Sequence, residues 1–341
     1  MPDNFIVRNY ALDILRILAC LMVVTMHAPL PGSASNGLFL SALSYLTAPG
    51  IGLFFMVSGA LLLPIKIDAR LFLKKRFSKI AIPTLIWSVI YLAIMVWTKK
   101  EPFSWNALFS IPFSAQGNPT FWFLYTLMGL YLLAPILSLW LKAASRRELE
   151  FYLLLWVVSL CYPLLRLIFD INTSTTGILY YFTGYVGYFV LGHYLKKYPD
   201  RIKYKWLIPA VIVAYAAPVF CKVKGLTVDF YSVFWYLSIF VVIQCIFIWK
   251  VVGSLVPEKG WPSINRAISR ISISTFGIYL IHYFIIRTLL WKWPPILAIQ
   301  PYALQVFVIT ATSLVLSYGL TLLISLLPGA EYLIGYKKTA H

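Results

Sequence analysis

Long runs of apolar residues alternate with short polar connections along the whole chain. Each run holds at least 18 residues, which as an α-helix at about 1.5 Å per residue is close to the length that crosses a bilayer core of about 30 Å. The pattern therefore predicts an all-α, polytopic integral membrane protein with about ten transmembrane helices. The expected spans are 11–30, 38–63, 80–98, 119–141, 149–168, 177–195, 206–223, 230–252, 272–290 and 302–327.

Proline and glycine weaken two of these runs. The second run is overlong and contains Pro49, Gly50 and Gly52, so we expect it to be tilted or broken there. Pro209 and Pro218 weaken the seventh run similarly. No connection is long enough for a soluble domain, and no internal repeat is visible. We therefore expect a single transmembrane domain over residues 1–341.

Composition and charge agree with this class and orient the helices. Hydrophobic residues make up 61% of the 341 residues, charged residues only 12%, and the mean hydropathy is +0.82, which excludes an ordinary soluble domain. With the N-terminus in the cytoplasm, 21 of the 29 Lys and Arg residues fall in cytoplasmic connections, five in the opposite ones and three inside spans. This asymmetry predicts that both termini are cytoplasmic. The net charge of +18 is dispersed over several loops, which favours topology and lipid headgroups over nucleic-acid binding.

Cysteine and histidine are too sparse to indicate a metal centre. The four cysteines lie in apolar runs without Cys-x-x-Cys or Cys/His spacing, so no metal is expected. Among the four histidines, we expect chemistry at His27 or His282. His282 shares a helical face with Tyr279, three residues earlier, and a purely structural hydrogen bond between helices is the alternative for it.

The first apolar run carries three groups that are costly in hydrocarbon, Asp13, Arg16 and His27. Arg16 and His27 are eleven residues apart, which is only about 20° beyond three helical turns and about 16 Å along the axis. The two side chains therefore share one stripe of the helix, with His27 the nearer to the outer face. Asp13 lies one turn before Arg16 and could pair with it. A buried pair that merely joins two helices is the alternative for Asp13 and Arg16.

Other candidate ligand-binding residues lie near the ends of spans. The segment RLFLKKRFSK, residues 70–79, leads into the third span, so Arg76 and Lys79 would meet a phosphorylated ligand at its cytoplasmic mouth. Arg166 and Arg287 fall towards the outer face, where they would hold an anionic acceptor; extension towards lipid headgroups explains them equally well. Trp122 belongs to a set of tryptophans suited to stacking on sugar rings.

Several of these segments together resemble a known family. Arg16, ten intervening residues and His27 form the R-X10-H motif of the acyltransferase 3 family of integral-membrane O-acyltransferases. The chain is most similar to the short, membrane-only branch, which includes the O-acetyltransferase of enterobacterial common antigen. A W-S-L-x-x-x-E motif of another branch is absent, because Phe123 follows Trp122 and Met128 stands at the glutamate position. The resemblance continues through LFFMVSGALL (53–62), KKRFSKIAIP (74–83), FWFLYTLMGLYLLAP (121–135) and STFGIYLIHYF (274–284).

The resemblance implies a reaction and a set of roles. An acetyl group would pass from cytoplasmic acetyl-CoA, with no tightly bound cofactor, to a hydroxyl of a cell-surface polysaccharide or lipid-linked glycan, as in lipopolysaccharide or exopolysaccharide modification at a bacterial inner membrane. His27 would be the general base, with a covalent acyl-histidine as the alternative. Ser58 would orient the thioester or stabilise the oxyanion, unless it only allows close packing beside Gly59. The coenzyme A phosphates would meet Arg16, Lys75, Arg76 and Lys79, and the acceptor would meet Asp13, Trp122, Tyr279, His282, Arg166 and Arg287.

A secondary transporter or glycan permease is the main rival function. In that case Asp13, Arg16 and His27 would form an intramembrane substrate or proton site. The sequence shows no inverted repeat, and the single broken span has no counterpart, which disfavours this function. Consumption of an acyl thioester would distinguish the two. The sequence predicts no particular oligomeric state.

Overall fold

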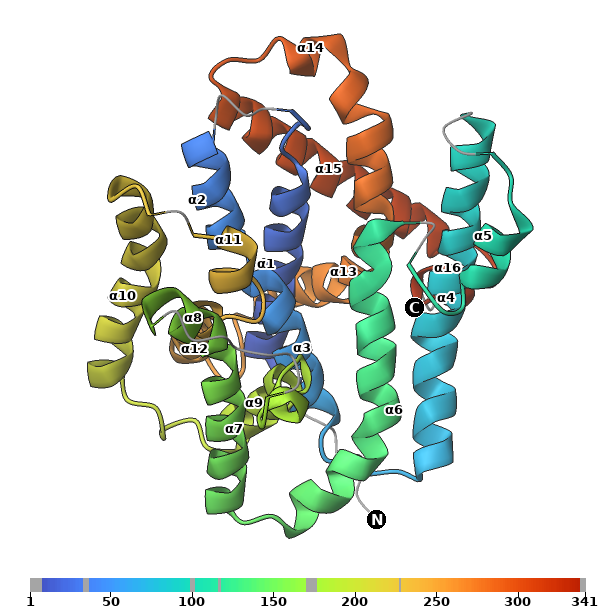
Figure 1. Ribbon diagram of the computed structural model, residues 1–341. Coiled ribbons are helices and arrows are strands. Elements are labelled where there is room, and N and C mark those ends of the chain that lie inside the picture. The colour runs from blue at the N-terminus through green and yellow to red at the C-terminus, as the bar shows by residue number, and fades with distance from the viewer. Residues whose placement is uncertain are drawn as a thin grey trace. The chain divides into compact units, whose positions relative to one another are not determined.

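The structure is a computed structural model that describes residues 8–32, 37–98, 102–115, 118–169, 177–226 and 228–337. Within these ranges it consists of helices and connections and contains no β-strand, so the predicted all-α class is confirmed (Figure 1). The longer helices are α1 Tyr10–His27, α2 Gly37–Thr47, α3 Pro49–Leu62, α4 Ala69–Trp97, α6 Trp122–Ala143, α7 Arg146–Leu160, α8 Tyr162–Phe169, α9 Val186–Lys197, α10 Tyr204–Val223, α12 Ile239–Leu255, α13 Asn265–Thr288 and α15 Tyr302–Ile324. The short elements are α5 Trp105–Ser110, α11 Phe230–Val233, α14 Pro294–Leu297, α16 Ala330–Ile334 and the 3-10 turns η2 Pro119–Phe121, η3 Tyr180–Phe182 and η4 Leu290–Lys292.

Most of the predicted spans appear as helices of membrane-crossing length. By length and composition, the described residues include seven stretches that could cross a membrane, or eight if the bent pair α7 and α8 forms one span. The predicted spans 177–195 and 230–252 instead contain shorter helices, α9 with 12 residues and α12 with 17. At about 1.5 Å per residue α9 is only about 18 Å long. The protein is thus a multi-pass membrane protein, while the count of ten spans and the cytoplasmic termini stay predictions.

The helix boundaries confirm the expectation for the second predicted span and differ from it for the seventh and the third. The second predicted span is broken as expected, because α2 ends at Thr47 and α3 begins at Pro49, whose missing N–H and ring disfavour helix before it. The seventh span is not broken, since α10 runs continuously through Pro209 and Pro218. The third span begins earlier than hydropathy indicates, at residue 69, where the Asp68 carboxylate accepts a hydrogen bond from the Leu71 amide and caps α4.

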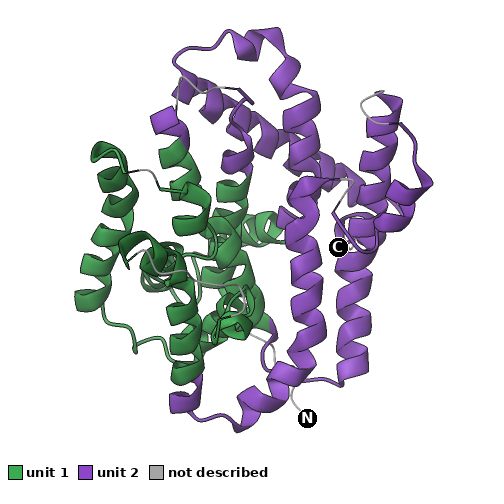
Figure 2. Cartoon of the chain, viewed as in Figure 1, with its two compact units in different colours: residues 1–23, 41–61, 150–273 green, residues 24–40, 62–149, 274–341 purple. Residues whose placement is uncertain are grey.

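The described chain divides into two compact units, which Figure 2 shows in different colours. Unit 1 comprises residues 1–23, 41–61 and 150–273, and unit 2 comprises residues 24–40, 62–149 and 274–341. Because the chain passes repeatedly from one unit to the other, each unit is assembled from segments that are distant in sequence. The predicted single domain over 1–341 stays a prediction.

In unit 1, glycines let helices α3 and α9 approach backbone to backbone. A side-chain carbon at Gly59 would lie 1.8 Å from the Phe189 carbonyl oxygen, and one at Gly192 would lie 1.9 Å from the Met56 carbonyl oxygen. No side chain fits in either place. Small residues are the usual means of such close helix packing in membranes. Residues 187–195 of α9 are all buried, so this short apolar helix packs its side chains against protein.

In unit 2, hydrogen bonds from α4 hold the C-terminal part of α13 and the segment after α15. The Tyr91 hydroxyl donates to the Leu280 carbonyl at 3.0 Å and accepts from the Phe284 amide at 3.0 Å. The Trp87 indole donates to the Leu333 carbonyl at 2.8 Å. Buried aromatic donors of this kind are costly unless they are paired, so these bonds fix which face of α13 each neighbouring helix meets.

Candidate functional site

Two histidines from distant parts of the sequence meet in unit 2. His27 is the last residue of α1, and His282 lies in the second half of α13. The Nε2 atom of His282 is 3.4 Å from the Nδ1 atom of His27, and the ring centres are 5.3 Å apart. His282 is completely buried, whereas His27 is partly exposed. Only His27 of the two is therefore open to a ligand.

The surroundings of His282 determine which nitrogen of each ring carries a proton. His282 Nδ1 lies 2.7 Å from the backbone carbonyl oxygen of Tyr279, and a carbonyl can only accept. This nitrogen therefore holds the proton. If both rings are neutral, His282 Nε2 accepts a hydrogen bond from Nδ1–H of His27, and the ring lone pair of His27 is on Nε2. In this arrangement Nε2 is the basic nitrogen of the partly exposed His27 ring.

Tyr279 and His282 share a helical face as predicted, and their contacts extend to the start of α6. The two rings are 5.6 Å apart, and the Tyr279 hydroxyl donates to the Thr120 carbonyl. The Tyr279 ring also lies 5.4 Å from that of Phe123, the neighbour of Trp122. Trp122 itself is partly exposed at the first position of α6. Because Tyr279 is buried, it does not reach an open surface and instead positions the turn of α13 that carries His282.

Tyr283 was not identified from the sequence, yet it contacts His27 directly. Its ring meets the His27 ring edge-on at 5.5 Å, and the Arg287 guanidinium lies over the Tyr283 ring at 5.9 Å from its centre. The signal was available, since Tyr279, Tyr283 and Arg287 are spaced four residues apart and so share one helical face. Tyr283 links the histidine pair to the residues at the end of α13.

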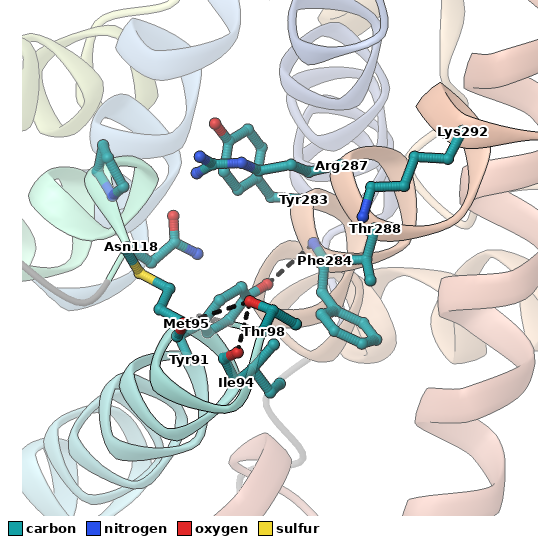
Figure 3. A pocket seen from close by; sticks show the side chains of 11 residues that line it. Tyr91, Ile94, Met95, Thr98, Asn118, Tyr283, Phe284, Arg287, Thr288 and Lys292 are labelled. Carbon is teal, nitrogen blue, oxygen red and sulfur yellow. Dashed lines mark hydrogen bonds between the residues drawn. The ribbon is translucent and has the colours of Figure 1, made fainter. Parts of the chain in front are cut away.

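A pocket of about 470 Å³, including the part open to solvent, lies on this side of unit 2. Helices α4 and α13 supply most of its wall, and Asn118 lies beside them (Figure 3). Figure 3 shows the Arg287 guanidinium lying across the Tyr283 ring. Asn118 was not identified from the sequence and carried no motif that would have singled it out. The lining residues are Tyr91, Ile94, Met95, Thr98, Asn118, Pro119, Tyr283, Phe284, Arg287, Thr288 and Lys292.

Asp13, in unit 1, has partners other than the predicted one. Its carboxylate accepts from Arg8 Nε at 2.6 Å and from the Ser272 hydroxyl at 2.6 Å, and Arg8 also reaches the Ser269 carbonyl at 3.3 Å. The pairing with Arg16 predicted from helical spacing is replaced by this cluster, which ties α1 to the first half of α13. Arg8 precedes the helix, so periodicity could not indicate it. Asp13 is 7% exposed, which favours anchoring over substrate contact.

The remaining predicted residues are distributed over both units. Arg16 is half-buried on α1 and Ser58 half-buried on α3, both in unit 1. Arg166 is exposed on α8, also in unit 1. In unit 2, the first three turns of α4 present Lys75 and Lys79 to solvent, while Arg76 lies over the Phe72 ring at 5.8 Å. Within the described ranges, no group of three His, Cys, Asp or Glu residues is placed to hold a metal ion.

Comparison with known proteins identifies the chain at the level of its family. The model of the acyltransferase 3 family, described as an acyltransferase domain, matches residues 9–322. The matched range contains both members of the histidine pair and every pocket residue. No curated protein and no solved structure matches the chain significantly. Because the family match covers most of the sequence and the helices are those of a multi-pass membrane protein, the chain belongs to the acyltransferase 3 family of membrane acyltransferases.

Proposed function

We propose that this protein is a membrane O-acetyltransferase that moves an acetyl group from cytoplasmic acetyl-CoA to a hydroxyl of a cell-surface polysaccharide or lipid-linked glycan, with His27 as general base. The bacterial inner membrane would be its location. The observation that carries the proposal is the histidine pair, because the buried His282 lies against Nδ1 of His27 and leaves Nε2 as the basic nitrogen of a partly exposed ring. A base of this kind is what attack by a sugar hydroxyl requires.

The chemistry follows from the protonation pattern. The acceptor hydroxyl attacks the thioester carbonyl while His27 Nε2 takes its proton. The tetrahedral intermediate then expels the coenzyme A sulfur, and the proton on Nε2 passes to that sulfur, so the acetyl ester and the free thiol are the products. Throughout, Nδ1–H of His27 stays directed at His282 Nε2. The bond becomes stronger when the His27 ring is positively charged, which stabilises the transition state more than the ground state.

The donor is proposed to meet the basic residues that the sequence singled out. Arg16 lies on the same continuous helix as His27, and the exposed Lys75 and Lys79 beside Arg76 form a cationic face at the start of α4. Guanidinium and ammonium groups suit the phosphates of coenzyme A. Ser58 keeps its predicted role of orienting the thioester. Arg166 and Trp122 keep theirs in acceptor binding, whereas the buried Asp13 is proposed to anchor α1.

The decisive experiment measures thiol release from acetyl-CoA by the purified protein in nanodiscs. Wild type is expected to bind acetyl-CoA and to release thiol, slowly by hydrolysis or faster with a glycan acceptor. His27→Ala should bind the thioester but turn it over about 10²- to 10⁴-fold more slowly, the range typical of a lost general base. Arg16→Ala should instead weaken acetyl-CoA binding. If wild type neither binds nor consumes the thioester, the proposal fails and the transporter alternative gains support.

A further inference from the structure

Among the residues that the structure describes, the buried Nδ2 atom of Asn118, in the pocket that Arg287 also lines, has no hydrogen-bond partner. Asn118 is 1% exposed, and its Oδ1 atom accepts from the Thr120 amide at 3.0 Å and from the Thr120 hydroxyl at 2.9 Å. Since an amide N–H can only donate, the atom facing it must be the oxygen, which identifies the other atom as Nδ2. Among the described residues, Nδ2 has no hydrogen-bond partner. A buried donor of this kind is costly unless a ligand completes it.

The same pocket is positively charged. Arg287 and Lys292 both line it, and none of the lining residues that the structure describes is an aspartate or glutamate. In the part of the chain that the structure describes, neither cation forms an ion pair with a carboxylate. The contact of Arg287 is with the face of Tyr283, which leaves the guanidinium N–H groups available in the plane. One buried amide donor and two cations are complementary to a group that only accepts hydrogen bonds and is negatively charged, namely a phosphate or a carboxylate.

The pocket is also within reach of the proposed base. The ring of Tyr283 lies 5.5 Å from the His27 ring centre, and Arg287 Cζ lies 5.9 Å from the Tyr283 ring centre. The His27 ring and the guanidinium are therefore at most 11.4 Å apart, the total of the two spacings. A ligand that spans this distance could hold its anion at Arg287 and extend a hydroxyl towards the His27 ring. By the predicted topology this end of α13 faces the outer side, where a glycan acceptor would arrive.

We infer that this pocket is the anion subsite for the acceptor, so that the protein acetylates a glycan or glycolipid bearing a phosphate or carboxylate. Asn118 and Arg287 bind the oxyanion, and Lys292 adds positive charge at the rim. That the bound glycan or glycolipid is acetylated rests on the proposed function, whereas the binding of its anion does not. The alternative, in which Arg287 only stacks on Tyr283 and the pocket binds no anion, leaves the Asn118 donor unexplained.

The test measures binding without catalysis. Calorimetric titration of the full-length protein in phosphatidylcholine nanodiscs, without acetyl-CoA, would compare glucose 1-phosphate with methyl glucoside. Wild type is expected to prefer the phosphate at least tenfold. Asn118→Asp keeps the oxygen that accepts from Thr120 but replaces the donor by a negative charge, and Arg287→Gln removes the guanidinium. Each substitution should weaken the binding of glucose 1-phosphate at least tenfold. The exposed matched controls Asn106→Asp and Lys222→Gln should stay within twofold of wild type.

The outcomes separate this inference from the proposed function. Equal binding of the two sugars by wild type, or unchanged phosphate binding by Arg287→Gln, overturns the anion subsite whatever Asn118→Asp does to folding. Selective binding without thiol release from acetyl-CoA supports the subsite while the proposed transfer fails. The same titration is repeated in nanodiscs that contain phosphatidylglycerol. Weaker binding of glucose 1-phosphate than in phosphatidylcholine assigns the anion to a lipid phosphate, and unchanged binding assigns it to the sugar. Both results support oxyanion recognition.

Discussion

Replacing His282 by phenylalanine tests whether the buried histidine positions the proposed base. Phenylalanine fills the buried site without a nitrogen, so the contact of His282 Nε2 with His27 Nδ1 is lost while the aromatic packing with Tyr279 is kept. His282 is completely buried and does not reach a ligand. The substitution should therefore lower kcat and leave KM for acetyl-CoA unchanged, because only an interaction that strengthens in the transition state is removed.

The magnitude follows from the change in charge on His27. A hydrogen bond between neutral groups contributes about 0.5–1.5 kcal/mol and one to a charged group about 1.5–3 kcal/mol, so protonation of His27 strengthens the contact by about 1–2 kcal/mol. The 3.4 Å separation is at the long end for a hydrogen bond, which favours the lower part of this range. At 1.36 kcal/mol for each tenfold change, we expect kcat to fall about 5- to 10-fold.

The assay is initial-rate thiol release from acetyl-CoA, with Ser313→Ala as the control. Ser313 donates to the His282 carbonyl at 3.4 Å, so its replacement disturbs the same turn of α13 but keeps both imidazoles. The control should retain wild-type kcat within twofold. A kcat for His282→Phe within twofold of wild type would show that the pair does not matter for catalysis. A loss as large as that of His27→Ala, in a variant with unchanged thermal stability, would show that His282 itself reacts.

Four further substitutions test the packing around these helices. Gly59→Ala should lower the thermal unfolding midpoint in detergent and destabilise by about 1–3 kcal/mol, because the added carbon would lie 1.8 Å from the Phe189 carbonyl oxygen. Gly129→Ala on α6, where nothing lies within 4 Å, should be neutral or stabilising by up to about 1 kcal/mol; equal effects of the two changes would contradict the close crossing of α3 and α9. Asp13→Asn should lower the free energy of unfolding by more than the ~1 kcal/mol of an exposed ion pair but by less than the ~3–5 kcal/mol of a fully buried one, since the Arg8 side chain is 38% exposed. Ser272→Ala should cost about 1 kcal/mol in the same unfolding measurement, and no loss for either change would show that the cluster around Asp13 does not hold α1 to α13.

Helix α9 shows where hydropathy alone is insufficient. Its apolar sequence predicts a membrane span, yet it is a 12-residue helix whose side chains are buried in protein. Apolar side chains are compatible with both lipid and a protein core, so the two environments give the same pattern. The close backbone contacts of Gly59 and Gly192 distinguish them, and these contacts exist only once α3 and α9 have packed together.

The sequence by itself determined the features that depend on local periodicity and on the cost of polar groups in hydrocarbon. These include the all-α membrane class, the position of most long helices, the placing of Arg16 and His27 on one helix, and the shared face of Tyr279 and His282. The R-X10-H motif lies within a single helix, so a linear pattern is enough to find it. The break before Pro49 was predictable for the same reason, since proline acts on its immediate neighbours.

Only the tertiary structure decided which side chains meet across helices. His27 and His282 are 255 residues apart, and the partners of Asp13 include Ser272, 259 residues away. The unpartnered amide of Asn118 becomes visible only when its oxygen is bound to Thr120 and its surroundings are closed. Such contacts depend on which helix faces pack together, and many packings of the same helices bury apolar surface equally well. The identity of the base is therefore indicated by the sequence, while its partner and its adjoining pocket come from the fold.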